Sequence, residues 1–211
     1  MIKVEHIETW GFEHAIRGMR NPMNSWDKSD SKKSSHVPND WIIGENDLDL
    51  MQRLYKAGHP HRKYLRQIFV SMDITTHHTF WSEFDTYKVG VTRNSCSKMH
   101  KIHVKPFTQD DFSHEGIDAV GGKTAEIFQS VISELERLRL LFNETKEKKY
   151  WRAIIDLLPL GFNLKATITM NYENVFNMLQ YRQNHKLDEW NVFCEILKDL
   201  PYIKEIGGFE A

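Results

Sequence analysis

Residues 157–190 constrain the fold most, because a turn, a strand and a helix follow one another there without a linker. Pro159 ends a helical pattern, since proline cannot donate a backbone hydrogen bond and restricts the residue before it. The residues after the turn alternate between apolar and polar, which is the period of a strand with one buried face. The apolar members are Ala166, Ile168 and Met170. Asn171 then predicts the start of a helix, because asparagine is a favourable N-cap residue.

The helix predicted after Asn171 carries polar side chains beside an apolar face. Val175, Met178 and Leu179 share that face, and Arg182 is the next position of the same series. Asn177 lies in the middle of the helix. Unpaired polar groups beside a core are costly, so this arginine and these amides need partners. The partners could belong to the protein, in which case the side chains brace a core helix, or to a bound ligand.

The composition is that of one globular domain, which we expect to span residues 1–211. A net charge of −1 gives no support for a nucleic-acid or membrane-surface partner, which usually requires a basic face. We expect no membrane span and no signal peptide, because no apolar run is long enough and the N-terminus is mixed and charged. Cys96 and Cys194 are too few for a disulfide scaffold or a zinc cluster, so a cytoplasmic location is expected.

Periodicity and turn signals predict the remaining elements. Further strands are expected at residues 2–7, 70–74 and 101–104, and further helices at residues 12–19, 48–54, 77–90, 150–157 and 190–200. Asn46 or Asp47 is expected to cap the second of these helices. The segment from residue 20 to Pro38 is rich in Ser, Asp and Lys and predicts a long loop, either solvated or functional. The sequence does not say what residues 20–45 do.

The longest helix is expected to begin at a Thr124 cap. One apolar stripe is predicted along it, made of Ile127, Val131, Leu135, Leu138 and Phe142. Charged residues are expected largely outside this stripe, at Glu134, Glu136, Arg137 and Arg139. A stripe of this length indicates a helix that packs in the core or against another subunit.

The proline turn, the strand and the spacing N-x(5)-N-x(4)-R together resemble the C-terminal signature of the flavin-dependent thymidylate synthases, also called thymidylate synthase complementing proteins. The matching positions are Asn171, Asn177 and Arg182. The resemblance implies that the two asparagines contact FAD. It also implies that Arg182 is a catalytic and substrate-binding residue, which binds dUMP and stabilises the ionised uracil ring. Residues 185–190 are similar to the H-A-Q-W-E continuation of the family, with an insertion.

A second part of the resemblance lies before the strand at residues 70–74. His61 falls on a histidine position of the family, which implies a contact with FAD, whereas Lys63 and Arg66 replace a hydroxyl residue and a glutamate. From the residues alone, this segment is a basic cluster that could hold a phosphate or pyrophosphate, made of His59, His61, Arg62, Lys63 and Arg66. We expect no metal here, because no carboxylate or cysteine completes a ligand set nearby in the sequence.

The segment that carries the R-H-R motif of the family is only partly kept. Asn94 and Ser97 match the asparagine and the serine of that segment, which implies a cofactor contact for Asn94 and a catalytic role beside dUMP for Ser97. Lys98 lies where a basic residue could bind the substrate phosphate. An ordinary polar loop is the alternative for these residues. Further positions depart from the family pattern: Tyr87, Lys88 and Val89 stand in place of R-H-R, Thr92 in place of a serine, Ser95 in place of a glutamate, and Ile155 in place of a dUMP-binding arginine.

Cationic side chains elsewhere are candidates to replace the lost contacts: Arg20, Arg62, Lys63, Lys88, Arg93 and Arg152. Tyrosine and valine cannot make the paired hydrogen bonds of an arginine guanidinium, so the sequence does not decide whether the protein is catalytically active.

The resemblance implies an α+β fold with a curved, mainly antiparallel sheet packed with helices, assembled as a homotetramer with sites at subunit interfaces. It implies that FAD carries a methylene from 5,10-methylenetetrahydrofolate to C5 of dUMP, giving dTMP with NADPH as reductant. Two alternatives stay open: a non-catalytic or altered-specificity homologue that binds a nucleotide or flavin, and a structural protein that keeps only the scaffold.

Overall fold

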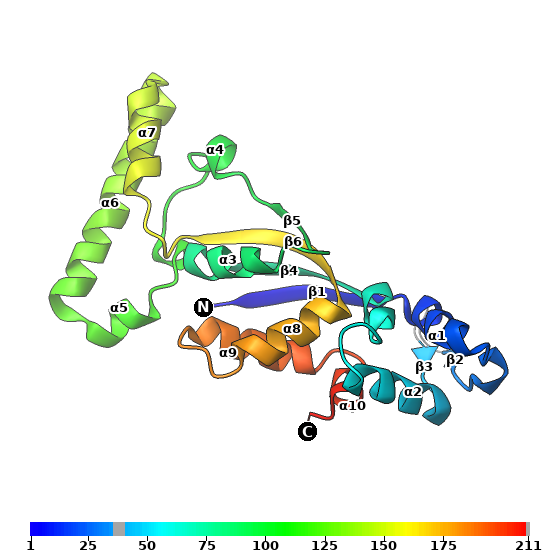
Figure 1. Cartoon of the computed structure of the whole chain (residues 1–211). Coiled ribbons are helices and arrows are strands. Elements are labelled where there is room, and N and C mark those ends of the chain that lie inside the picture. Colours follow the sequence, from blue (N-terminus) through cyan, green and yellow to red (C-terminus); the bar gives the residue numbers. More distant parts are fainter. Residues whose placement is uncertain (36–40, 210–211) are drawn as a thin grey trace. The chain divides into compact units, whose positions relative to one another are not determined.

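A computed structural model describes residues 1–35 and 41–209. These residues form two compact units that alternate along the chain (Figure 1). Unit 1 consists of Met1–Lys3, Ile74–Thr86 and Asn94–Ala166, and unit 2 of Val4–Asp73, Tyr87–Arg93 and Thr167–Ala211. The expectation of a single domain over residues 1–211 stays a prediction.

The strands form a four-stranded antiparallel sheet with helices, in the order β1-β4-β6-β5, which confirms the α+β class. The bounds are Lys3–Trp10 for β1, Phe69–His77 for β4, Thr92–Ser95 for β5 and Asn163–Asn171 for β6. The predicted alternation is confirmed, because Ala166, Ile168 and Met170 are at most 1% exposed. The strands expected at residues 2–7 and 70–74 are confirmed as parts of β1 and β4.

The strand expected at residues 101–104 is wrong. A short helix, α4 (Lys98–Lys101), and a turn occupy this segment. The carbonyl of His103 accepts hydrogen bonds from Arg139 Nη1 at 3.4 Å and Asn143 Nδ2 at 3.0 Å. The N–H groups of Lys101, Ile102 and Val104 donate to backbone carbonyls three or four residues earlier. Local turns and side chains of α6 thus satisfy backbone groups that a strand would have paired.

The helices of unit 1 are α3 (His78–Phe84), α4, α5 (Glu115–Val120), α6 (Gly122–Thr145) and α7 (Lys148–Leu157), and α6 and α7 lie side by side (Figure 1). Residues of α6 and α7 supply most of one apolar cluster, Phe128, Leu135 and Ile154 among them. The predicted cap of α6 is wrong, because Gly121 precedes the first helical residue and Thr124 lies inside the first turn.

The apolar stripe of α6 is rotated relative to the prediction. Its buried members are Phe128, Ile132, Leu135 and Leu138. Ile127 is 54% exposed, and Arg139, expected outside, is 8% exposed. The cause is tertiary: the ring of Phe128 meets that of Phe112 edge to face at 5.6 Å, and Arg139 is paired with Glu136.

Unit 2 contains the helices from the N-terminal and the C-terminal parts of the chain. They are α1 (Phe12–Arg20), α2 (Glu45–Lys56), α8 (Tyr172–Arg182), α9 (Asp188–Lys198) and α10 (Ile203–Gly207). The segment from residue 20 to Pro38 was expected to be one loop, and part of it lies outside the described residues. Its described part holds the 3₁₀ turns Asn21–Met23 and Trp26–Lys28 and the strand β2 (Lys32–Lys33), which pairs antiparallel with β3 (Trp41–Ile42).

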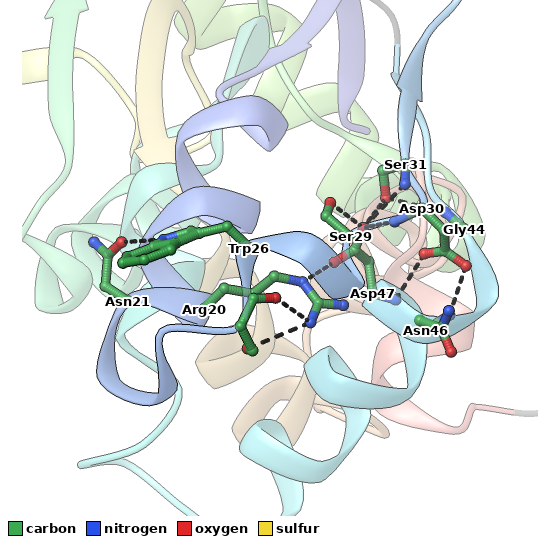
Figure 2. Close-up of polar contacts among 10 residues, drawn as sticks. Arg20, Asn21, Trp26, Ser29, Asp30, Ser31, Gly44, Asn46 and Asp47 are labelled. Carbon is green, nitrogen blue, oxygen red and sulfur yellow. Dashed lines mark hydrogen bonds and ion pairs between the residues drawn. The ribbon is translucent and has the colours of Figure 1, made fainter.

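A buried ion pair fixes this segment to α2 (Figure 2). Arg20 Nε donates to Asp47 Oδ1 at 2.6 Å, and the two side chains are 4% and 0% exposed. Asp47 Oδ2 accepts from the hydroxyls of Ser29 and Ser31 and from the backbone N–H groups of Asp30 and Ser31. Burial raises the pKa of the Asp47 carboxyl, but the hydrogen bonds from the two serines and the arginine outweigh burial and hold that pKa below its usual value.

The cap of α2 comes from this segment and not from the helix itself. Gly44 is the N-cap residue, and the backbone N–H groups of Asn46 and Asp47 donate to the Asp30 carboxylate at 2.9 and 3.1 Å (Figure 2). The prediction that Asn46 or Asp47 is the cap is therefore wrong. A carboxylate at a helix N-terminus satisfies free N–H groups wherever it comes from in the sequence.

Candidate functional site

Arg182 ends α8 and lies among aromatic side chains of unit 2. Its Nε donates to the Tyr87 hydroxyl at 2.9 Å, and its Nη1 lies 3.2 Å from Nε2 of His185. Its guanidinium carbon is 5.4 Å from the centre of the Tyr87 ring and 4.8 Å from that of Trp190, which is fully buried. Cations are attracted to aromatic faces, so these neighbours orient the guanidinium. Tyr87 stands at the position where the R-H-R motif of the synthase family has its first arginine.

Asn171 is the N-cap of α8, as predicted. Its Oδ1 accepts from Asn174 N at 3.1 Å, and Asn174 Oδ1 accepts from Asn171 N at 3.3 Å, which is a reciprocal capping box. Asn174 Nδ2 also donates to the carbonyl of Val89 at 2.8 Å. Gly90 has φ +77°, and a Cβ there would lie 2.7 Å from Asn171 Nδ2, so glycine permits this close approach. The cap thus holds residues 89–90 against the start of α8.

Asn177 and the segment before β4 contact each other within unit 2. Asn177 is half-buried, and its Oδ1 accepts from Arg62 Nη2 at 3.3 Å. His61 is exposed, and so is Lys63, the first residue of the 3₁₀ helix Lys63–Gln67. The structure therefore brings the predicted Asn177 next to the predicted basic cluster.

The basic cluster surrounds a carboxylate that the sequence did not indicate. Glu173, in the first turn of α8, forms ion pairs with Arg62 and Arg66, and its Oε1 lies 3.2 Å from Nδ1 of His59. The hydrogen bond from Arg66 raises the pKa of that guanidinium. In the sequence Glu173 is only an acidic residue in a helical first turn, and no local signal connects it to residues 59–66.

Ser97 and Lys98 begin α4 in unit 1. Ser97 is the N-cap residue, because its Oγ accepts from His100 N at 3.2 Å. Lys98 Nζ lies 2.6 Å from Nε2 of His78, and burial lowers the pKa of Lys98. Both residues line a cavity of about 470 Å³, whose wall also includes Lys101, Lys105, Lys165, Ile102, Phe162 and Leu164. Asp110 and Asp111 also line the cavity, and Asp111 pairs with Lys105, so the wall carries both charges beside its apolar part. Lys98, Lys101 and Lys165 are the cationic groups through which it could hold an organic anion.

Two other predicted positions in unit 1 lie apart from these contacts. Asn94 is an exposed residue of β5. Ile155 packs against the apolar cluster of unit 1, as an isoleucine in place of an arginine would. Arg152, a candidate to replace that arginine, is instead paired with Asp156, and its Nε donates at 3.0 Å. Arg20 is likewise occupied, by Asp47.

None of the helices that the structure describes combines the length and the apolar character needed to cross a bilayer. No protein-family model matches the chain, and no curated protein sequence matches it either.

Solved structures do match, along almost the whole chain. Thymidylate Synthase X (ThyX) from Helicobacter pylori, crystallised with FAD and dUMP, aligns with a TM-score of 0.69 at 16% identity, over 97% of this chain and 96% of that one. A second crystal structure, of flavin-dependent thymidylate synthase ThyX from the same organism complexed with FAD and dUMP, aligns with a TM-score of 0.65 at 15% identity, over 97% and 95% of the two chains. The chain therefore has the fold of the flavin-dependent thymidylate synthases.

Proposed function

We propose that this protein binds FAD and dUMP and methylates dUMP to dTMP, with methylenetetrahydrofolate and NADPH as co-substrates. The observation that carries the proposal is the ThyX fold along the whole chain, in structures solved with FAD and dUMP. Within that fold, Asn171, Asn177 and Arg182 lie on one helix, at its cap, in its middle and at its end. A shared fold alone does not fix activity, so the side chains must support the same chemistry.

The residues proposed to hold FAD differ in how well they fit it. Asn177 uses its Oδ1 on Arg62, which leaves its amide N–H groups as donors for a flavin, and the exposed His61 ring is accessible. Asn171 is committed through Oδ1 to the helix cap and offers only its Nδ2. Asn94 is an exposed contributor from β5. The flavin supplies the redox chemistry, and these residues bind and orient it.

Arg182 is proposed to bind the uracil ring of dUMP. Negative charge develops on the ring during the reaction, and a fixed guanidinium stabilises it without reorganising. Tyr87, His185 and Trp190 supply the fixed orientation, since each lies against the guanidinium. Ser97 and Lys98 are proposed to contact dUMP from α4, with the Lys98 ammonium pairing with its phosphate.

Binding without turnover is the second candidate. The observation that favours it is the replacement of charged family residues. Ile155, which packs against the apolar cluster of unit 1, stands in place of a dUMP-binding arginine. Tyr87, which binds Arg182, and Val89 remove charged partners of FAD. Each lost charge-assisted contact costs roughly 1.5–3 kcal/mol, so two lost contacts weaken binding about a hundredfold or more. We therefore expect weak FAD binding and not tight retention.

Calorimetry with dUMP tests the role of Arg182. Arg182→Lys should weaken dUMP binding more than about tenfold, because lysine keeps the charge but loses the planar fork. Arg152→Lys is the matched control, since it makes the same change at an exposed arginine paired within its own helix. Unchanged dUMP affinity in a normally melting Arg182→Lys protein would show that Arg182 only braces α8. Wild-type protein that binds no dUMP would overturn the proposed function itself.

Fluorescence titration of FAD and a dTMP assay separate the two candidates. FAD binding with dTMP formation supports the synthase, and FAD binding without product supports the non-catalytic homologue. No change in fluorescence up to millimolar FAD would leave only the scaffold role.

We further propose a homotetramer with its sites at subunit interfaces, located in the cytoplasm. Exposed apolar residues on α6, Ile127 at 54% and Leu140 at 55%, are suited to a subunit contact. Light scattering should return about four chain masses. A monomer at micromolar concentration would contradict both the assembly and the shared sites.

A further inference from the structure

Two arginines and a histidine of residues 59–66 converge on one carboxylate of α8. Arg66 Nε donates to Glu173 Oε2, while His59 Nδ1 and Arg62 Nε lie 3.2 and 3.5 Å from Glu173 Oε1. The Arg62 guanidinium also lies over the Tyr55 ring, with its carbon 5.6 Å from the ring centre. All these residues belong to unit 2.

The carboxylate is buried but poorly satisfied. The Glu173 side chain is 9% exposed, and among the described residues its Oε1 and the Arg62 Nε make no hydrogen bond although both are buried. Buried polar groups normally find a hydrogen-bond partner, and an exception calls for an explanation. An oxygen 3.5 Å from the guanidinium it faces has charge attraction without good hydrogen-bond geometry.

The contacts of His59 are a second indication that Glu173 is a poor hydrogen-bond partner for this cluster. Its Nδ1 lies 3.1 Å from Arg66 Nη2 and 3.2 Å from Glu173 Oε1. A neutral Nδ1 accepts from the arginine, and a protonated Nδ1 donates to the glutamate, so the ring cannot satisfy both neighbours at once. His59 and Arg66 are 61% and 46% exposed, so a ligand can reach them from solvent.

We propose that His59, Arg62 and Arg66 form a binding site for a pyrophosphate group, and that the Glu173 carboxylate occupies this site until such a ligand displaces it. Arginine forks pair with phosphate oxygens through two parallel hydrogen bonds, which the single carboxylate does not provide for both arginines. A pyrophosphate carries more negative charge and more acceptor oxygens than the Glu173 carboxylate or a single phosphate group. The site therefore favours a diphosphate over a monophosphate.

This inference does not depend on the proposed synthase activity, because inorganic pyrophosphate is a sufficient probe. Calorimetry at low salt with wild-type protein and Glu173→Gln measures the competition. Removing the negative charge should tighten pyrophosphate binding about tenfold, since one repulsive charge within a few ångströms is lost. The matched control is Glu195→Gln, which makes the same change at a glutamate paired with Lys198. Equal effects of the two substitutions would overturn the proposal, because they would report net charge alone.

Arg66→Gln keeps the proposal testable if Glu173→Gln does not fold. Arg66 is nearly half exposed, so this variant should fold, and it should lose most of the pyrophosphate affinity. Unchanged affinity would overturn the site. ADP and FAD then distinguish the source of the pyrophosphate group: tightening of FAD by Glu173→Gln assigns the site to the flavin cofactor, and tightening of ADP alone assigns it to a free nucleoside diphosphate. If Glu173→Gln tightens the binding of neither FAD nor ADP and leaves pyrophosphate affinity unchanged, then Glu173 is not displaced by a ligand and the proposal is wrong.

Discussion

Two buried carboxylates of unit 2, Asp47 and Glu173, each face arginines but differ in how well they are satisfied. Both oxygens of Asp47 accept hydrogen bonds, and only Nη2 of its partner Arg20 is left without one among the described residues (Figure 2). Glu173 faces Arg62 and Arg66, yet its Oε1 makes no hydrogen bond.

The difference separates a structural network from a candidate site. The donors to Asp47 come from the same segment that supplies the Asp30 carboxylate to the start of α2, so the network fixes this segment to the helix. Glu173 does not satisfy all the hydrogen-bond donors of Arg62 and Arg66, and an anion with more charge can compete with it for these arginines. A buried ion pair by itself is weak evidence of stability or of function, and its hydrogen bonds decide between the two.

Asp47→Asn should have the largest effect on stability. It leaves the buried Arg20 charge without its partner, and breaking a buried pair in this way costs about 3–5 kcal/mol. Urea denaturation at fixed protein concentration measures the free energy of unfolding. Asp49→Asn is the control, because Asp49 pairs with Arg53 on the exposed face of the same helix and should cost less than about 1 kcal/mol. Equal losses would contradict the structural role of the buried pair.

The same carboxylate predicts an acid dependence. The folded-state pKa of Asp47 lies below its usual value of 3.8, so its contribution is complete above that pH and is lost as the pH falls toward the folded-state pKa. Denaturation of wild type and Asp47→Asn between pH 6 and pH 3 compares the two curves. We expect the gap in unfolding free energy to be constant above pH 5 and to narrow below pH 4. A constant gap down to pH 3 would show that Asp47 is not the group responsible.

Asp30→Ala should cost about 1–2 kcal/mol, the usual loss on removing an N-cap, because it frees two backbone N–H groups of α2. Thermal melting measures it. Asp27→Ala is the control, because it removes a carboxylate from the preceding 3₁₀ turn without touching the cap. A wild-type melting temperature for Asp30→Ala would mean that solvent caps α2 equally well.

Glu173→Gln should have the smallest effect, about 1 kcal/mol. The glutamine carbonyl can still accept from Arg66, and Arg66 is 46% exposed and regains water when the charge pair is lost. Urea denaturation checks this value beside that of Asp47→Asn. A loss as large as that of Asp47→Asn would place Glu173 with the structural networks and remove the contrast between the two carboxylates.

The sequence predicted those elements whose signal is local. The alternation of Ala166, Ile168 and Met170 and the cap at Asn171 were sufficient for β6 and the start of α8, because burial on one face and N–H satisfaction act over a few residues. The strand expected at residues 101–104 was wrong because the segment forms a short helix and a turn, whose His103 carbonyl accepts from distant side chains of α6.

The candidate site divides in the same way. The sequence by itself identified Arg182 and the amides of its helix as polar groups in need of partners, and residues 59–66 as a basic cluster. Ser97 and Lys98 were identified only by the resemblance to the synthase family. Only the tertiary structure decided which partners they have: Tyr87 and Trp190 for Arg182, Glu173 for the basic residues, and Asp30 for the start of α2. The physical reason is that charge pairing and capping depend on distance in space, and the residues that meet here are separated in the sequence by as many as 115 positions.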